Sequence, residues 1–99
     1  MRPIHVAQLD KERPVLVLTR EIVRPHLSRV TAAPITPTIR GLSTEVSVGV
    51  VNGPDDESVV SCDNILTVPV TALGAQIGYL LPGQELQLGE SIRAAFDLA

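Results

Sequence analysis

With 99 residues, 44% of them hydrophobic, the chain can fill one core, and we expect a single domain over residues 1–99. The single cysteine, Cys62, excludes an internal disulfide and a cysteine-based zinc site, and the lack of a signal peptide or of a membrane-spanning run of about 18 apolar residues predicts a cytoplasmic protein with no membrane partner. The formal net charge of −3 argues at first against a nucleic-acid partner, because phosphate binding normally leaves a basic footprint.

The first half of the chain has the composition of short strands. β-Branched residues are interrupted there by prolines and small polar clusters. The continuous apolar run over residues 14–18 predicts a strand covered on both faces, whereas the alternation over residues 44–48 predicts one buried and one exposed face. Residues 52–57 form a turn by their Asn, Gly, Pro and Asp content. The expected strands are residues 3–9, 14–19, 29–35, 43–50, 58–62, 65–68 and 75–81.

The last segment changes to a helical pattern. Pro82 is well placed near a helix start. Apolar residues then recur at three- and four-residue spacing, which predicts a helix over about residues 83–97. These residues are Leu88, Ile92, Ala95 and Phe96. Strands followed by one packed terminal helix describe an α+β fold, mainly β, built as a small antiparallel barrel.

Charge is unevenly distributed along the sequence. Residues 11–40 contain six Lys or Arg against two Glu, a balance of +4, and residues 41–99 contain one Arg against eight acids, a balance of −7. One half of the chain could face a polyanion while the other keeps the molecule soluble, so we expect the acidic half mostly on the opposite face. Chance clustering along the sequence is an equally good interpretation.

Three segments, read in order, carry a resemblance to a known family. They are Glu12–Leu18, Ala33–Gly41 and Asp56–Val68, and they are followed by two more short matches, Leu73-Gly74 and Ile77-Gly78. The first has an Arg-Pro before an apolar strand, the second an apolar strand that ends in Thr and a basic loop, and the third a Ser-Val-Val strand that runs into Cys-Asp. Together they resemble the MazF/PemK toxins, which implies an SH3-like barrel with a C-terminal helix, the CcdB/PemK toxin fold.

The resemblance also implies an activity and partners. It implies a metal-independent endoribonuclease, without a cofactor, that cuts single-stranded RNA at a specific short sequence. The ribose 2′-OH would attack the adjacent phosphate and leave 2′,3′-cyclic phosphate and 5′-OH ends. Such a toxin works as a homodimer, inhibits translation and growth, and is neutralised by a cognate MazE-like antitoxin.

Three residues are candidates for catalysis, because RNA self-cleavage needs positive charge at the phosphorane oxygens and groups that move protons. Arg13 suits the charge role, since its guanidinium presents a planar fork of donors to phosphate. Thr36 could donate a hydrogen bond to the scissile phosphate; on local pattern alone it is a strand-end Thr that satisfies its own turn, and the resemblance favours the catalytic role. Asp63 could act as general base if burial strengthens it, or it is a turn-forming residue.

A second set of residues is expected to bind RNA. Its members are Lys11, Arg24, His26, Thr38 and Arg40, and a solvated surface role is the alternative for the loop charges. His5 is expected to be a packed or dimer-face residue. Neither histidine has a second ligand at suitable spacing nearby, so we expect no metal site.

The chain departs from the family pattern at two places. Residues 10–12 replace a longer Gly-rich loop, and Ser61 stands where some relatives have an arginine with a proton-transfer role. Neither the cleavage sequence nor the identity of the general acid or base therefore carries over. The alternative function is that of a CcdB-like toxin, which has the same fold and poisons DNA gyrase without cutting RNA. CcdB-like toxins end in a Trp-containing tail that binds gyrase, and this chain has no tryptophan. That absence and the motifs around Arg13 and Thr36 favour the nuclease.

Overall fold

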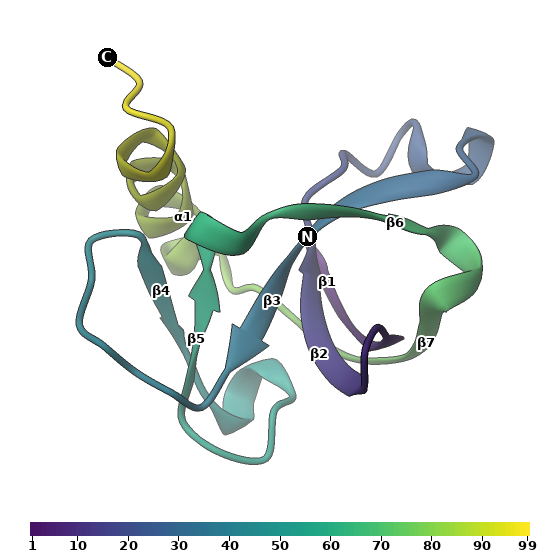
Figure 1. Cartoon of the computed structure of the whole chain (residues 1–99), viewed down its shortest axis with the longest axis horizontal. Coiled ribbons are helices and arrows are strands. Elements are labelled where there is room, and N and C mark those ends of the chain that lie inside the picture. The colour runs from purple at the N-terminus through teal and green to yellow at the C-terminus, as the bar shows by residue number, and fades with distance from the viewer.

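The computed structural model describes residues 1–99 and contains a seven-stranded sheet with a helix at the C-terminal end (Figure 1). The strands are β1 (Pro3–Gln8), β2 (Glu12–Val17), β3 (Arg29–Thr36), β4 (Glu45–Val48), β5 (Ser58–Ser61), β6 (Leu66–Pro69) and β7 (Leu73–Tyr79). The helices are α1 (Pro82–Ala95) and the short 3₁₀ turns η1 (Arg24–His26), η2 (Val50–Asn52), η3 (Cys62–Asn64) and η4 (Val70–Ala72). All strand pairs are antiparallel, so the predicted α+β, mainly β, fold is confirmed.

Strand β3 organises the sheet because it pairs with three other strands. β2 pairs along one edge of β3. Along the other edge, residues 29–32 pair with β6, and the last two residues, Ile35 and Thr36, pair with β5. The turn η3 connects β5 to β6 and therefore lies beside the middle of β3. This pairing brings residues 61–64 close to the end of β3, although a long stretch of sequence separates them.

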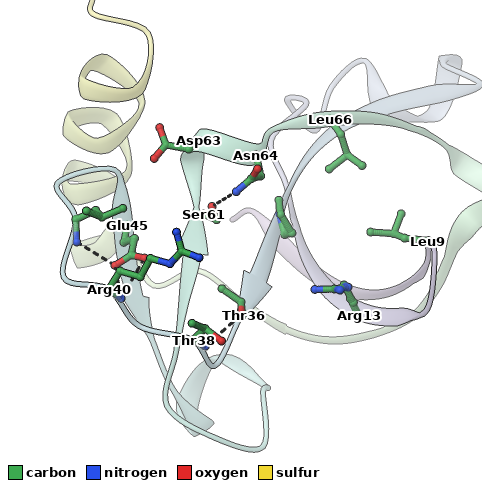
Figure 2. Close-up of a pocket in the computed structure, with 12 residues that line it drawn as sticks. Leu9, Arg13, Thr36, Thr38, Arg40, Glu45, Ser61, Asp63, Asn64 and Leu66 are labelled. Carbon is green, nitrogen blue, oxygen red and sulfur yellow. Dashed lines mark hydrogen bonds between the residues drawn. The ribbon is translucent and has the colours of Figure 1, made fainter.

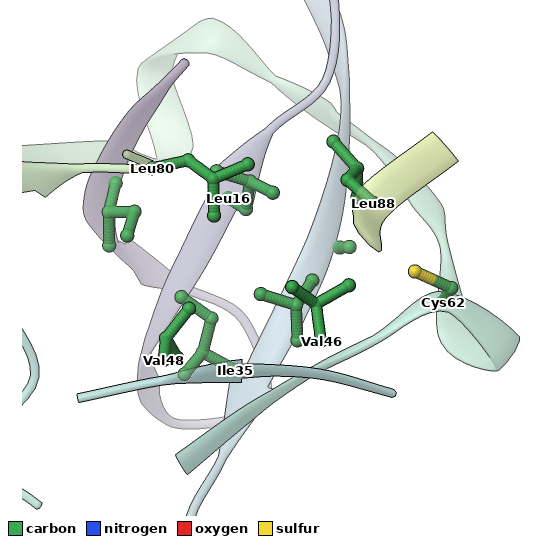
Figure 3. Close-up of a cluster of buried hydrophobic side chains, with 10 residues drawn as sticks. Leu16, Ile35, Val46, Val48, Cys62, Leu80 and Leu88 are labelled. Atoms are coloured by element: carbon green, nitrogen blue, oxygen red, sulfur yellow. The ribbon is translucent and has the colours of Figure 1, made fainter. Parts of the chain in front are cut away.

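Two groups of buried side chains fill the two faces of the sheet. Leu16 belongs to the larger group and Val15 and Val17 to the smaller, which confirms that β2 is covered on both faces. In the larger group Leu88 of α1 packs against side chains from the sheet (Figure 3). Its buried members are Ile4, Leu16, Ala33, Ile35, Val46, Val48, Val60, Cys62, Leu80 and Leu88.

The C-terminal helix is one residue longer at its start and two shorter at its end than the pattern predicts. Leu88 is buried, and Ile92 and Ala95 pack against the larger core group. The expectation that Phe96 belongs to the same apolar face is wrong, since Phe96 is 57% exposed. The helix ends at Ala95, Phe96 is its C-cap residue, and Asp97 follows in a left-handed conformation with φ 53°, so the apolar spacing extends one residue beyond the helix.

A buried amide pair joins the η2 turn to the start of α1. Asn52 is fully buried, and its Nδ2 donates to the carbonyl of Tyr79 at 2.9 Å and to Gln84 Oε1 at 2.7 Å. Gln84 Nε2 donates in return to Asn52 Oδ1 at 3.2 Å and to the carbonyl of Ser47 at 3.0 Å. A Cβ at Gly78 would lie 2.0 Å from the Asn52 carbonyl oxygen, so this approach of the two backbones requires glycine.

This network predicts a large loss of stability when the Asn52 amide is removed. Asn52→Ala is expected to lower the free energy of unfolding by about 2–3 kcal/mol, because buried polar groups of Gln84 and of the backbone lose their partner. Urea denaturation followed by circular dichroism measures the change. Asn64→Ala is the matched control, since Asn64 is exposed and bonds only to Ser61. Equal losses in the two variants would contradict a stabilising role of the buried amide.

Candidate functional site

A cleft of about 660 Å³ opens where the β1–β2 turn, the end of β3, the loop after β3 and the turn η3 meet (Figure 2). Its polar lining comes from segments far apart in the sequence. The charged residues and threonines among the lining residues are Arg13, Thr36, Thr38, Arg40, Glu45 and Asp63. All three residues expected to be catalytic therefore face one cavity.

Of the residues expected to bind RNA, Thr38 and Arg40 line the cleft, and Lys11, Arg24 and His26 do not. Lys11 is exposed at the β1–β2 turn, and His26 is exposed in η1. The Arg24 guanidinium lies 3.7 Å from Glu21, and its Nε is buried without a partner. RNA contact by these last three residues stays a prediction.

Arg13 presents the end of its guanidinium to the cleft. It is the second residue of β2, and its side chain is 35% exposed. Its Nε lies 3.4 Å from Asp10 Oδ1, and the two terminal nitrogens have no partner in the protein. The backbone N–H of Lys11, which donates to Asp10, and the charge of Arg13 lower the pKa of Asp10, so this carboxylate stays ionised at neutral pH. The ion pair with Asp10 thus engages Nε. The two terminal nitrogens of the guanidinium remain free and point toward the middle of the cleft (Figure 2).

Thr36 ends β3 with its hydroxyl already oriented. The backbone N–H of Thr38 donates to Thr36 Oγ1 at 3.1 Å. A hydroxyl that accepts a bond in this way keeps its own hydrogen for another acceptor. Thr36 can therefore form the turn and still face a substrate. The turn occupies a lone pair of Oγ1, and the hydroxyl hydrogen remains available to an acceptor in the cleft.

The structure does not supply the burial that the general-base hypothesis for Asp63 requires. Asp63 is exposed in η3, and its Oδ2 accepts a hydrogen bond of 2.6 Å from the hydroxyl of Thr44. The neighbouring Cys62 is buried, and desolvation together with the charge of Asp63 raises the pKa of its thiol to about 11. Cys62 therefore stays protonated at neutral pH and belongs to the core.

The sequence analysis did not single out Glu45 or Asn64, which also line the cleft. No local pattern marks them, because they reach the cleft only through the pairing of β3, β4 and β5. The cleft holds two cations, Arg13 and Arg40, and two anions, Glu45 and Asp63. Two of the eight acids of residues 41–99 thus line the cleft, so the expectation that the acidic half lies mostly on the opposite face is wrong for Glu45 and Asp63.

Internal donors hold both anions. Glu45 accepts from the backbone N–H groups of Arg40 and Leu42, and Asp63 accepts from Thr44. The structure contains no group of three or more His, Cys, Asp or Glu placed to hold a metal ion. It also contains no helix with the length and apolar content needed to cross a membrane.

Comparison of the sequence with known families and proteins gives matches over nearly the whole chain. A family described as PemK-like, MazF-like toxin of type II toxin–antitoxin system matches residues 3–96. Endoribonuclease MazF3 of Mycobacterium tuberculosis is 68% identical over 98 residues, which cover 99% of this chain and 95% of that protein. The probable endoribonuclease MazF2 of the same species is 38% identical over 85 residues, which cover 85% of this chain and 83% of that protein.

Solved structures give the same result for the fold. The Mycobacterium tuberculosis toxin MazF-mt6 superposes with a TM-score of 0.97 at 67% identity and covers 99% of both chains. An endoribonuclease from a mycobacterial species, solved in complex with its cognate antitoxin, superposes with a TM-score of 0.83 at 24% identity and covers 98% of this chain and 93% of its own. The barrel-like arrangement is thus shared well beyond the similar sequences.

Proposed function

Because the chain belongs to the family of PemK-like, MazF-like toxins of type II toxin–antitoxin systems, we propose that it is an endoribonuclease that cuts single-stranded RNA in the cleft around Arg13 and Thr36. One observation carries this proposal. Arg13 offers the free fork of its guanidinium and Thr36 offers a free hydroxyl hydrogen, and both line the same cleft. Donors of both kinds stabilise the negative charge that develops on the phosphate oxygens in the transition state.

In the proposed reaction the RNA supplies its own nucleophile. The ribose 2′-oxygen forms a bond to the adjacent phosphorus, the bond from phosphorus to the 5′-oxygen breaks, and the products are a 2′,3′-cyclic phosphate and a 5′-OH end. Negative charge grows on the non-bridging oxygens in between. The planar fork of Arg13 stabilises this charge by two parallel bonds, and Thr36 donates a third.

Two proton transfers accompany the reaction, one from the 2′-OH and one to the departing 5′-oxygen. Asp63 is the proposed acceptor of the first proton, since it is a carboxylate on the cleft wall. Asp63 is exposed and already accepts a hydrogen bond from Thr44, which fits a supporting role beside the charge stabilisation by Arg13. Thr38 and Arg40 extend the donor surface along the cleft for RNA binding, and Lys11, Arg24 and His26 are proposed contacts outside it.

The proposed assembly is a homodimer that a MazE-like antitoxin neutralises, with inhibition of translation and growth as the result of RNA cleavage. A contiguous exposed apolar patch marks an interaction surface. Val50 and Val51, which are adjacent in η2 and 70% and 78% exposed, are the proposed members of such a patch.

Since the ribose supplies the nucleophile, cleavage is expected to need no metal-bound water. A long RNA incubated with the protein in excess EDTA should be cut at the same sites and rate as without EDTA. The product 5′ ends should accept a phosphate from polynucleotide kinase without prior phosphatase treatment, and mapping these ends gives the cleavage sequence. The 3′ ends should resist polyadenylation until the cyclic phosphate is removed.

An Arg13→Ala preparation purified in parallel shows whether a contaminating nuclease is responsible. Loss of cleavage on chelation with recovery on adding Mg²⁺ would overturn the metal-independent mechanism. Intact RNA with folded protein under both conditions would overturn the nuclease proposal and favour a toxin of the same fold that poisons gyrase.

A further inference from the structure

The loop between β3 and β4 carries Thr38 and Arg40 into the cleft, and a single carboxylate holds it. Glu45 Oε1 accepts from the backbone N–H of Arg40 at 3.2 Å and from the backbone N–H of Leu42 at 3.1 Å. Gly41 lies between these donors with φ 74°. A left-handed residue between two N–H groups turns both toward one point, and such a concavity binds an anion. Here the anion is the side chain of Glu45 (Figure 2).

Glu45 is itself attached to the rigid part of the molecule. It is the first residue of β4 and pairs with Ser61 of β5, whose side chain lines the cleft. Its backbone N–H donates to the carbonyl of Leu42 at 3.1 Å, so the loop is held from both sides. The side chain of Glu45 forms no ion pair with the guanidinium of Arg40, which leaves that guanidinium free for a ligand.

We propose that Glu45 is a positioning residue for RNA cleavage: its carboxylate fixes the loop after β3 so that Arg40 stays in the cleft, opposite Arg13. This inference rests on the proposed function, because it assigns Arg40 to RNA binding at that same cleft. Glu45 acts through the backbone of the loop, and neither its charge nor its ability to move a proton takes part in the reaction.

Substitutions can separate a positioning role of Glu45 from a role of its charge or proton, because one carboxylate oxygen accepts both backbone hydrogen bonds at the shorter distances. Glu45→Gln keeps that oxygen and removes the charge. Glu45→Ala removes the acceptor, and Glu45→Leu removes it while keeping an apolar stem should the alanine variant fold poorly. Glu45→Gln should therefore keep the loop ordered and RNA binding intact, whereas Glu45→Ala and Glu45→Leu should lose both. A role of Glu45 in proton transfer would instead make all three variants defective in cleavage.

Amide hydrogen exchange tests the tether without RNA. In the wild type and in Glu45→Gln, the amides of Arg40 and Leu42 should exchange slowly and at rates within about twofold of each other. In Glu45→Ala or Glu45→Leu they should exchange about tenfold faster or more, which corresponds to a loss of about 1.4 kcal/mol in the local stability of the loop. Unchanged exchange in folded Glu45→Leu would overturn the tether.

Steady-state cleavage of a short RNA tests the consequence for binding. Glu45→Ala or Glu45→Leu should raise KM about tenfold and leave kcat within about threefold, as expected when binding common to ground state and transition state is lost. Glu45→Gln should be close to the wild type. In an Arg40→Ala background the Glu45 substitution should have little further effect, because the residue it positions is gone. Glu90→Ala is the matched control, since Glu90 is exposed on α1 and makes no side-chain hydrogen bond or ion pair.

The failures of the two proposals are distinguishable. If the wild type does not cut RNA, the proposed function fails, and the exchange experiment still decides whether Glu45 holds the loop. If the wild type cuts RNA and Glu45→Gln loses kcat as severely as Glu45→Ala, Glu45 acts by charge or proton transfer and the positioning role is overturned. Independent, multiplicative effects of the Glu45 and Arg40 substitutions would overturn it as well.

Discussion

Replacement of Arg13 by alanine is expected to slow single-turnover RNA cleavage by about 10²–10³-fold, equivalent to roughly 3–4 kcal/mol of transition-state stabilisation. The reason is that the free N–H groups of Arg13 bind the non-bridging phosphate oxygens, whose negative charge develops only as the 2′-oxygen attacks. Binding of the intact RNA should weaken far less than the rate falls, because the ground-state phosphate needs the same donor less. Lysine should rescue the rate poorly, since a point charge lacks the two-pronged geometry.

The measurement is single-turnover cleavage of a short RNA at saturating protein, with binding measured separately on a non-cleavable analogue that carries a 2′-methoxy group at the cleavage site. Arg93→Ala is the matched control, because Arg93 is an exposed arginine on α1 with no ion pair. Circular dichroism and sedimentation check the fold and the oligomeric state of each variant. A near-wild-type rate in folded Arg13→Ala would remove this residue from the site.

Thr36→Val should lower the same rate by about 10²-fold or somewhat less, since a neutral hydroxyl donor stabilises the transition state less than a guanidinium does. Valine keeps the shape and the β-branch of threonine, so β3 should form unchanged. The substitution also removes the acceptor for the Thr38 N–H, which lies at the exposed edge of the cleft where water can replace it. Thr67→Val, at an exposed position of β6, provides a matched control in which the same methyl-for-hydroxyl exchange should leave the rate unchanged.

The Arg13→Ala, Thr36→Val double variant shows whether the two residues act on one phosphate. Groups that stabilise the same transition state are usually non-additive, so the double variant should be less impaired than the product of the two single effects. Fully multiplicative effects would mean that the two residues contribute independently. A folded Thr36→Val variant with the wild-type rate would exclude the hydroxyl from catalysis.

Most of the fold could be predicted from the sequence because its signals are local. The apolar run over residues 14–18 marks a strand covered on both faces, and the structure places Leu16 in one core group and Val15 and Val17 in the other. The terminal helix follows from apolar spacing of the same local kind, although it begins one residue and ends two residues before the predicted bounds and leaves Phe96 exposed. The end of a helix depends on the backbone conformation of one or two capping residues, which the spacing of apolar residues does not reveal.

The motifs in the sequence predict three candidate catalytic residues, Arg13, Thr36 and Asp63, and the structure brings these three candidates to one cleft. Arg24 and His26 were chosen for residue type alone and lie outside it, because the turn η1 is on a different part of the surface. The division of the sequence into a basic and an acidic half failed to predict the positions of Glu45 and Asp63 for a related reason. Strand pairing can bring distant segments together, and it places these two acids in the same cleft as Arg13 and Arg40.

The strands, the terminal helix and the kinds of phosphate donor in the chain follow from the residues alone, since side-chain chemistry and hydrophobic periodicity are local properties. Which of these donors share a cleft depends on how distant strands pair. β3 pairs with β5 and β6 along one edge, which sets η3 beside the middle of β3, and the pairing of β4 with β5 places Glu45 where its carboxylate accepts from the loop that carries Arg40. Those contacts join residues far apart in the chain, and their register depends on the packing of the whole barrel.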